Sequence, residues 1–252
     1  MGLGKAIDRT ASGDKAGIME RRYVLPYNWC LPTTSRGWRQ KEGIFTIIDG
    51  LLQEEENLGA LSLLDVGCGD GWYTARFAEK AKEVVGIDPS EQAIGFAKQL
   101  VKKAAFRVGS ATDIPFDDET FDVVVSIQTL EHIPPEDLSR ACEEITRVVK
   151  RGGAVIISVP SVLRPMSTAH YQHFTVESFV SYMPQDAELA QVVGQEHHTM
   201  VLHVVERLLQ NRVWLLTPLA ERFNRTWFQK VWNATSGDKG QNLILQFRRS
   251  SR

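Results

Sequence analysis

The chain has 252 residues, 43% hydrophobic and 24% charged, which is the composition of an ordinary globular protein large enough to bury a core. This composition excludes a disordered chain, a collagen and a coiled coil. Basic and acidic side chains number 29 and 31, so no bulk positive charge attracts nucleic acid, which we do not expect as a partner. Cys30, Cys68 and Cys142 are too few and too widely spaced for a disulfide framework or a zinc cluster, and a reducing compartment is expected.

The two ends of the chain carry most of the basic excess. Residues 1–43 hold eight basic and four acidic side chains, and residues 221–252 hold seven and two. This layout is compatible with an anionic ligand, although solvated surface charge is the simpler explanation. The first twenty residues lack the apolar core of a secretory signal, and no stretch is apolar enough to span a bilayer. We therefore expect a cytoplasmic protein without a membrane span.

The N-terminal part predicts a tail, an arm and a helix. Residues 1–20 are expected to be flexible, and residues 23–38 mix aromatics with prolines, as an ordered arm or lid would. Over residues 38–52 apolar side chains recur at helical spacing, which indicates an amphipathic helix on a core. The members of this stripe are Ile44, Ile47, Ile48, Leu51 and Leu52.

The middle of the chain alternates between strand and helix patterns. Strands are expected at residues 61–66, 83–88, 105–108, 121–127 and 154–159, and helices at residues 72–82, 90–102 and 135–150. Ser90 is the expected N-cap of the second helix, and Gly152 and Gly153 are expected to end the third. Such alternation predicts βαβ units in a parallel sheet covered by helices on both faces.

The last third is less regular. A loop at residues 160–174 precedes a helix capped by Thr175 and running to about residue 183, and a strand is expected at residues 189–195. A long helical region at residues 200–232 contains Trp214, Trp227 and Trp232. A turn at residues 237–240 leads into a last strand at residues 242–247. We expect one domain over residues 21–252, divided into a lid and helix (21–58), a ligand-binding core (61–160) and a remainder (161–252).

A glycine loop follows the first predicted strand. Residues 63–71 read LLDVGCGDG, a strand that runs into glycines and opens a helix. In an open α/β sheet ligands bind beyond the carboxyl ends of the strands, and glycines let the backbone approach them closely. A dinucleotide fold would place its third glycine at position 72, which is Trp72 here. The pattern is instead Asp-x-Gly-x-Gly-x-Gly.

This pattern resembles the first motif of the class I S-adenosylmethionine-dependent methyltransferases. The resemblance implies an α/β, three-layer Rossmann-like methyltransferase fold with a mostly parallel seven-stranded sheet. It also implies S-adenosyl-L-methionine as cofactor, with S-adenosyl-L-homocysteine as product. In that family the loop, here Asp65, Gly67, Cys68 and Gly69, surrounds the methionine part of the cofactor.

Three further segments extend the resemblance, specifically to the branch that includes ubiquinone and menaquinone methyltransferases. Asp88 and Pro89 end the second strand about 20 residues past the loop, where an acid suits the two ribose hydroxyls. Residues 111–116 resemble the adenine segment, which implies that Thr112, Asp113 and Ile114 contact the base. Gln128 lies after the fourth strand, which implies a position near the methionine end. The resemblance covers residues 61–160 firmly and the rest in outline.

Methyl transfer from a sulfonium needs alignment and exclusion of water, and a hydroxyl nucleophile also needs a base. His132, after the fourth strand, is the first candidate for this base, although a structural role, with its ring bonded to the backbone, is the simpler explanation. His170 and His173 lie in the loop after the fifth strand and are the other candidates. We expect no metal, because no nearby carboxylate or cysteine completes a ligand set with these histidines.

The arm supplies candidates of its own. Tyr23, Tyr27, Trp29 and Trp38 are packing residues or a lid over the cofactor, and Arg39 is a candidate partner for the cofactor's carboxylate. The sequence thus predicts a methyltransferase acting on a small molecule or glycan, most simply on oxygen, with an anionic acceptor left open. RNA or protein methylation, a non-catalytic cofactor-binding protein and a homodimer all stay open as alternatives.

Overall fold

The structure is a computed structural model that describes residues 23–32, 35–195, 234–236 and 239–251. The helices are α2 (Arg36–Gln53), η1 (Leu58–Ala60), α3 (Trp72–Phe77), α4 (Glu91–Leu100), η2 (Leu130–His132), α5 (Pro135–Val148) and α6 (Val176–Val180). The strands are β1 (Ser62–Val66), β2 (Glu83–Asp88), β3 (Ala105–Val108), β4 (Phe121–Ile127), β5 (Val149–Pro160), β6 (Ala187–Gln195), β7 (Ala234–Ser236) and β8 (Asn242–Arg249).

One sheet organises these elements, in the order β3-β2-β1-β4-β5-β8-β6-β7. The first five strands of this order pair in parallel, and β8, β6 and β7 add antiparallel pairs. The predicted α/β fold with a mostly parallel sheet is therefore confirmed. Its seven expected strands are all present among the described residues, and the three-residue β7 extends the β6 edge by one more strand.

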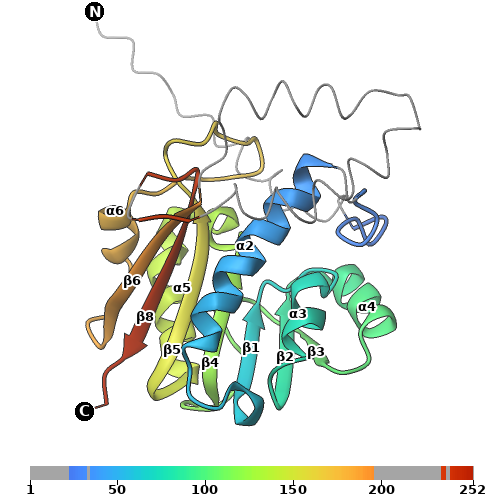
Figure 1. The fold of residues 1–252 in the computed structure, drawn as a ribbon, viewed down its shortest axis with the longest axis horizontal. Helices are drawn as coiled ribbons and strands as arrows, with labels where there is room; N and C mark the ends of the chain where they lie inside the picture. Colours follow the sequence, from blue (N-terminus) through green and yellow to red (C-terminus); the bar gives the residue numbers. More distant parts are fainter. Residues whose placement is uncertain (1–22, 33–34, 196–233, 237–238, 252) are drawn as a thin grey trace, which may run out of the picture.

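Helices cover both faces of the sheet, as Figure 1 shows, with α2 and α5 on opposite sides of β4 and β5. Successive side chains of a strand point to opposite faces, and the core divides accordingly. Leu63 of β1 belongs to the apolar cluster with α2 and α3, whereas Leu64 belongs to the cluster with α5 and α6. Ile156 and Ile157 of β5 divide in the same way. The three-layer arrangement is therefore confirmed.

Several element boundaries differ from the sequence prediction. The helix expected over residues 72–82 ends at Phe77. Ser90 caps α4, as predicted, by accepting a hydrogen bond from the backbone N–H of Ala93 at 3.2 Å. The strand expected from residue 154 begins at residue 149, because Gly152, at φ 74°, lies within an irregular stretch of β5 rather than after a helix.

The structure describes only some of the elements predicted for the last third of the chain. Thr175 caps α6 in a capping box with Ser178, but this helix ends at Val180 rather than near residue 183. The expected tail (1–20) and long helical region (200–232) lie outside the described residues. His197, His198 and His203 lie outside the described residues as well. The expectation of one domain over residues 21–252 stays a prediction.

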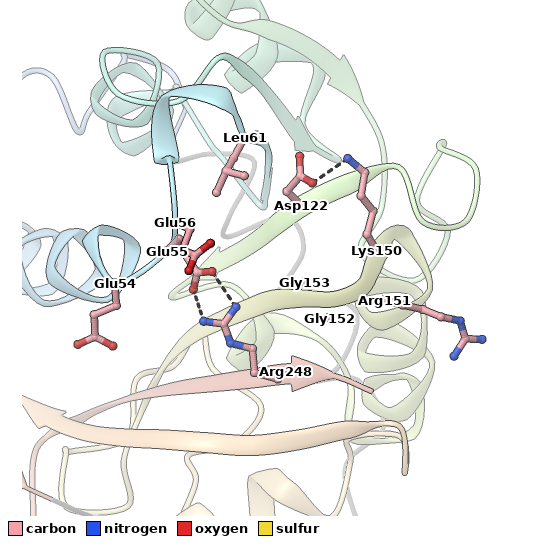
Figure 2. Close-up of a pocket in the computed structure, with 10 residues that line it drawn as sticks. All are labelled: Glu54, Glu55, Glu56, Leu61, Asp122, Lys150, Arg151, Gly152, Gly153 and Arg248. Carbon is pink, nitrogen blue, oxygen red and sulfur yellow. Dashed lines mark hydrogen bonds and ion pairs between the residues drawn. The ribbon is translucent and has the colours of Figure 1, made fainter. Parts of the chain in front are cut away.

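A cavity of about 410 Å³ lies at the amino-terminal end of β5, far from the carboxyl ends of the parallel strands (Figure 2). Arg248 donates to the two carboxylate oxygens of Glu55 at 2.6 and 2.7 Å, and Lys150 donates to Asp122 at 2.8 Å. These pairs join the segment after α2 to β8, and β4 to β5. The charged side chains at this end therefore serve to connect elements.

No helix among the described residues is both long and apolar enough to cross a membrane.

Candidate active site

A second cavity, of about 580 Å³, lies at the carboxyl ends of β1, β2 and β4, and Tyr23, Tyr27, Asn28 and Leu31 of the N-terminal arm are among its lining residues. This is where the connectivity of an open α/β sheet leaves room for a ligand. Eight of the predicted site residues line it: Gly67, Cys68, Gly69, Asp88, Pro89, Gln128, His132 and His170. Asp65, Thr112, Asp113, Ile114 and His173 are not among the lining residues.

The glycine loop after β1 leaves no room for side chains. Gly67 has φ 77°, and a Cβ atom there would lie 2.2 Å from Cγ2 of Thr129. Gly69 has φ 56°, and a Cβ atom there would lie 2.5 Å from the hydroxyl of Tyr23. Both positions require glycine for conformation and for space, and they bring the backbone to the cavity wall.

Asp88 is held rigidly at the end of β2. Its carboxylate accepts hydrogen bonds from the backbone N–H groups of Gly69 and Ser90, both at 2.9 Å, and the residue is 7% exposed. Each carboxylate oxygen has a second lone pair. A buried acid that faces the cavity beside a glycine loop fits the diol of a ribose, and in this respect the site fits S-adenosylmethionine.

Asp65 lies beneath the glycine loop. It is 1% exposed and accepts a hydrogen bond from Oγ1 of Thr74 in α3 at 2.6 Å. Burial raises the pKa of Asp65 to about 7, against the opposing effect of the Thr74 hydrogen bond. The structure thus places this residue between β1 and α3, where it joins the loop to the helix that the loop opens.

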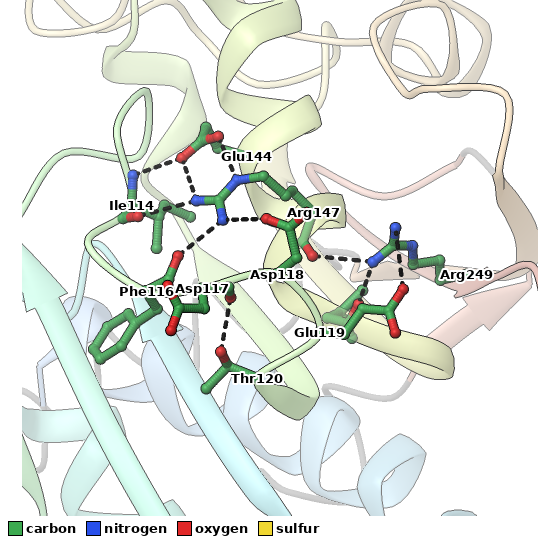
Figure 3. Close-up of polar contacts among 10 residues, drawn as sticks. Ile114, Phe116, Asp117, Asp118, Glu119, Thr120, Glu144, Arg147 and Arg249 are labelled. Carbon is green, nitrogen blue, oxygen red and sulfur yellow. Dashed lines mark hydrogen bonds and ion pairs between the residues drawn. The ribbon is translucent and has the colours of Figure 1, made fainter.

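The loop after β3, which the resemblance assigned to the adenine, is fastened to α5 (Figure 3). Glu144 accepts from the backbone N–H of Ile114 at 2.8 Å, and Arg147 donates to the carbonyl oxygens of Ile114 and Phe116 at 3.1 and 2.8 Å. Hydrogen bonds from Arg147 lower the pKa of Glu144. Ile114 is 3% exposed within the core, whereas Asp113 is exposed.

The N-terminal arm is attached to the glycine loop. Asn28 donates its backbone N–H and its side-chain Nδ2 to the two carboxylate oxygens of Asp70, at 2.9 and 2.7 Å. Trp29 donates its indole N–H to the carbonyl oxygen of Asp70 at 2.9 Å. Burial raises the pKa of Asp70, and the Asn28 hydrogen bonds oppose that effect. The arm therefore covers the cavity, with Tyr23 and Tyr27 among its lining residues.

The structure places Lys41 at the cavity and not Arg39, the predicted partner of the cofactor's carboxylate. Lys41 of α2 lines the cavity, and its Nζ lies 5.2 to 5.8 Å from the ring centres of Tyr27, Trp72 and Tyr73. Arg39 is 5% exposed and is not a lining residue. Among the described side chains of α2, Lys41 is thus the cation that lines the cavity.

Gln128 and Arg164 form the wall on the β4–β5 side. Gln128 has φ 53°, unusual for a residue other than glycine, and its Nε2 donates to Ser158 at 3.3 Å. Nη1 of Arg164 donates to Oε1 of Gln128 at 2.9 Å and to Oδ1 of Asn242 at 3.0 Å. Sequence reasoning missed Arg164, because its partners lie 36 and 78 residues away.

The three predicted histidines lie together. Nδ1 of His132 hydrogen-bonds the carbonyl oxygen of Ala169 at 2.9 Å, and the backbone N–H of Tyr171 donates to the carbonyl oxygen of Glu131 at 2.8 Å. Nδ1 of His170 hydrogen-bonds Nε2 of His173 at 2.8 Å. These contacts fasten the loop after β5 to η2, with His132 and His170 at the cavity and His173 behind.

Glu131 completes this group. It is 1% exposed and lines the cavity, and one of its carboxylate oxygens lies within 4.8 Å of a ring nitrogen of His132 and of His170. The premise that no carboxylate lies near the histidines is therefore wrong, because residues 131 and 170 meet only in the folded chain. The sequence signal that could have identified Glu131 is its place directly before His132.

Comparisons with known proteins agree with this geometry. Residues 64–157 match the family described as "Methyltransferase domain". The chain is 31% identical over 132 residues to a ubiquinone biosynthesis O-methyltransferase of Rhizobium etli, covering 51% of this chain and 52% of the relative. It is 38% identical over 115 residues to a chloroplastic tocopherol O-methyltransferase of Arabidopsis thaliana, covering 43% and 32%. The chain thus spans about half of the first relative's length, and less of the second's.

Among solved structures, a putative methyltransferase of Bacillus halodurans C-125 shares the fold with a TM-score of 0.58 at 19% identity. The match covers 80% of this chain and 98% of the other. At this identity the likeness concerns the fold alone. The family match spans β1 to β5, and the glycine loop and Asp88 that follow these strands line one cavity. Residues 64–157 thus match the methyltransferase domain family, and the sequence comparisons support a class I S-adenosylmethionine-dependent methyltransferase.

Proposed function

We propose that this protein transfers a methyl group from S-adenosylmethionine to an oxygen atom of a small-molecule or glycan acceptor. One observation carries the proposal. The glycine loop and Asp88 line one part of the 580 Å³ cavity, and Glu131, His132 and His170 line another part of the same cavity. The residues proposed to bind the cofactor and side chains able to accept a proton therefore line the same cavity.

The cofactor would supply a methyl group on a sulfonium, so that a C–S bond breaks while an O–C bond forms and a neutral thioether remains. The residues of this chain bind, orient and exclude water. Asp88 would accept hydrogen bonds from the ribose hydroxyls, and the arm with Tyr23 and Tyr27 would keep water from the sulfonium. A cavity histidine would take the acceptor's hydroxyl proton.

The acceptor is proposed to carry a hydroxyl on an aromatic or sugar ring. The relatives named above are described as O-methyltransferases, of ubiquinone biosynthesis and of tocopherol. Lys41 and Arg164 bring two cationic side chains to the cavity, which supports an acceptor that also carries an anionic group. We therefore rank hydroxybenzoates first, then neutral phenols and sugars.

Cofactor binding is tested by calorimetry with S-adenosylhomocysteine. We expect one site per chain in the wild type and at least about 10-fold weaker binding by Asp88→Ala, because each hydrogen bond to a charged group contributes about 1.5–3 kcal/mol. Asp88→Asn keeps the shape but removes the charge and should fall in between. Glu188→Ala, at an exposed position of β6, is the matched control. Absence of binding by the wild type would refute the proposal.

Catalysis is tested by following S-adenosylhomocysteine formation with a panel of hydroxybenzoates, phenols, sugars, an RNA and a protein substrate. We expect turnover with a hydroxyl-bearing small molecule and an oxygen-bound methyl in the product. Turnover only with RNA or protein would support those alternatives instead. Cofactor binding without turnover on any acceptor would favour a non-catalytic binding protein.

A further inference from the structure

His173 lies one layer behind the cavity. It is not a lining residue, whereas His170 lines the cavity and is 7% exposed. The two rings lie 5.1 Å apart between centres and are joined by the 2.8 Å contact from Nδ1 of His170 to Nε2 of His173. His173 can therefore affect the reaction through His170 but does not contact a ligand in the cavity.

A backbone carbonyl determines the direction of this contact. Nδ1 of His173 lies 3.0 Å from the carbonyl oxygen of Arg164, which can only accept a hydrogen bond. The proton of a neutral His173 is therefore on Nδ1, and its Nε2 carries the lone pair. That Nε2 in turn accepts from Nδ1 of His170, so the lone pair of a neutral His170 is on Nε2.

We propose that His173 is a positioning residue that holds His170 in the tautomer with its lone pair on Nε2, so that His170 is the base for the acceptor hydroxyl. This inference rests on the proposed function. In the step, the hydroxyl proton passes to Nε2 of His170, the O–C bond forms, and the C–S bond breaks. The imidazolium of His170 then returns its proton to water after the product leaves.

Burial lowers the pKa of His173, and the positive charge of Arg164 acts in the same direction, against the hydrogen bonds with the backbone of Arg164 and Ser161. A neutral His173 is what the tautomer assignment requires. The carboxylate of Glu131, within 4.8 Å of a ring nitrogen of His170, favours the positive charge that His170 gains in the step.

Other titratable or charged groups of the described residues share the cavity with His170 or contact it, and they bear on any pH profile. They are Glu131 and His132 on the segment after β4, Arg164, Tyr171 and His173 on its own loop, and Lys41, Cys68, Tyr73, Asp88, Tyr23 and Tyr27 elsewhere in the cavity lining. Of these, only His173 has a ring nitrogen at 2.8 Å from Nδ1 of His170, and His132 uses its own Nδ1 on Ala169. The contact with His173 therefore places the proton of a neutral His170 on Nδ1.

The chain offers a matched pair of variants. In His173→Gln the amide can still donate to the carbonyl of Arg164 and accept from His170, whereas His173→Leu removes both hydrogen bonds at similar volume. We expect the kcat of His173→Gln to stay within about threefold of the wild-type value. His173→Leu should lose up to about 100-fold in kcat, the lower end of what a positioned base contributes, with KM unchanged within about twofold.

The direct readout is the tautomer of His170 in proton–nitrogen NMR spectra of histidine-labelled protein, assigned with His170→Gln. The wild type and His173→Gln should show His170 protonated on Nδ1, and His173→Leu should show a mixture of tautomers. This measurement needs neither acceptor nor turnover, so it fails or succeeds separately from the proposed function. S-adenosylhomocysteine binding and thermal unfolding confirm that each variant is folded.

Three results would overturn the proposal. The first is a wild-type spectrum in which neutral His170 carries its proton on Nε2. This test uses the wild type alone, so it can be made even if His173→Leu does not fold. The second is a folded His173→Leu protein whose His170 tautomer and pH–rate profile match the wild type. A loss of kcat in His173→Leu that His173→Gln shares fully would also count against it, because the amide keeps both hydrogen bonds.

Discussion

Asp65 is expected to make the stability of the fold fall as the pH rises. Burial raises its pKa from 3.8 to about 7 in the folded protein, so between these values the folded state binds more protons than the unfolded state. Stability is therefore highest below about pH 4 for this group and is lost as the pH rises to about 7. At 1.36 kcal/mol per pKa unit the loss amounts to about 4 kcal/mol at most.

Asp65→Asn removes the charge and keeps an oxygen that accepts from Thr74 at nearly the same shape. The free energy of unfolding in urea should be similar for the two proteins near pH 4. It should be higher for the variant at pH 8, by up to about 4 kcal/mol. Asp122→Asn is the control. Burial alone would raise the pKa of Asp122, but hydrogen bonds from Lys150 and Ser62 hold it below its usual value. The pH-dependent part of its contribution to stability therefore lies below pH 4. From pH 5 to 8 the difference in free energy of unfolding between Asp122→Asn and the wild type should stay constant.

A difference between Asp65→Asn and wild type that stays constant with pH, or that declines as the pH rises, would refute the reasoning. The same variant tests where Asp65 acts. Because it lies under the loop and outside the cavity lining, we expect S-adenosylhomocysteine affinity to change by less than about twofold at pH 6. A folded variant that no longer binds would show that Asp65 contacts the cofactor, as the family motif implies.

Three other outcomes are expected. Gly67→Ala should lower the free energy of unfolding by about 2–5 kcal/mol, because residue 67 has φ 77° and the new Cβ would lie 2.2 Å from Cγ2 of Thr129. A loss below about 1 kcal/mol in urea or thermal unfolding would contradict this tight fit. Asn28→Ala should weaken S-adenosylhomocysteine binding about tenfold, because the arm loses its side-chain hydrogen bond to Asp70; unchanged affinity in calorimetry would show that the arm does not retain the cofactor. Chelation with EDTA should leave turnover unchanged, because displacement at a sulfonium requires alignment rather than a Lewis acid; a loss restored by a divalent cation would assign the group around Glu131 to metal binding.

The parallel strands of the sheet could be predicted from the local sequence pattern. Strand and helix periods alternate over residues 61–127, and the observed strands begin and end within a residue of those expected. Asp88 followed from the same logic, since the carboxyl ends of parallel strands meet at one edge of the sheet. The start of β5 did not, because Gly152 and Gly153 are typical of a helix end, while here they belong to an irregular strand.

The rest of the candidate site depends on contacts between distant residues. Asn28 and Asp70 are 42 residues apart, and His132 and Ala169 are 37 apart. Nothing in the local pattern around Asn28 distinguishes it from other polar residues of the arm. Periodicity reports which face of an element is buried and carries no information on which side chains meet across loops. The pairing of Glu131 with His170 therefore required the folded chain.

The loop after β5 is fastened at both ends. Ser161 donates its backbone N–H and its hydroxyl to Gln241 and Gly240 at 2.9 and 2.6 Å, and Ala169 and Tyr171 are joined to η2. Between these anchors Val162, Leu163 and Met166 are exposed. Arg164, which lies among these three exposed residues, lines the cavity, whereas the three themselves do not. Under the proposed function, libraries restricted to Val162, Leu163 and Met166 can therefore vary the surroundings of Arg164 without replacing any residue that lines the cavity.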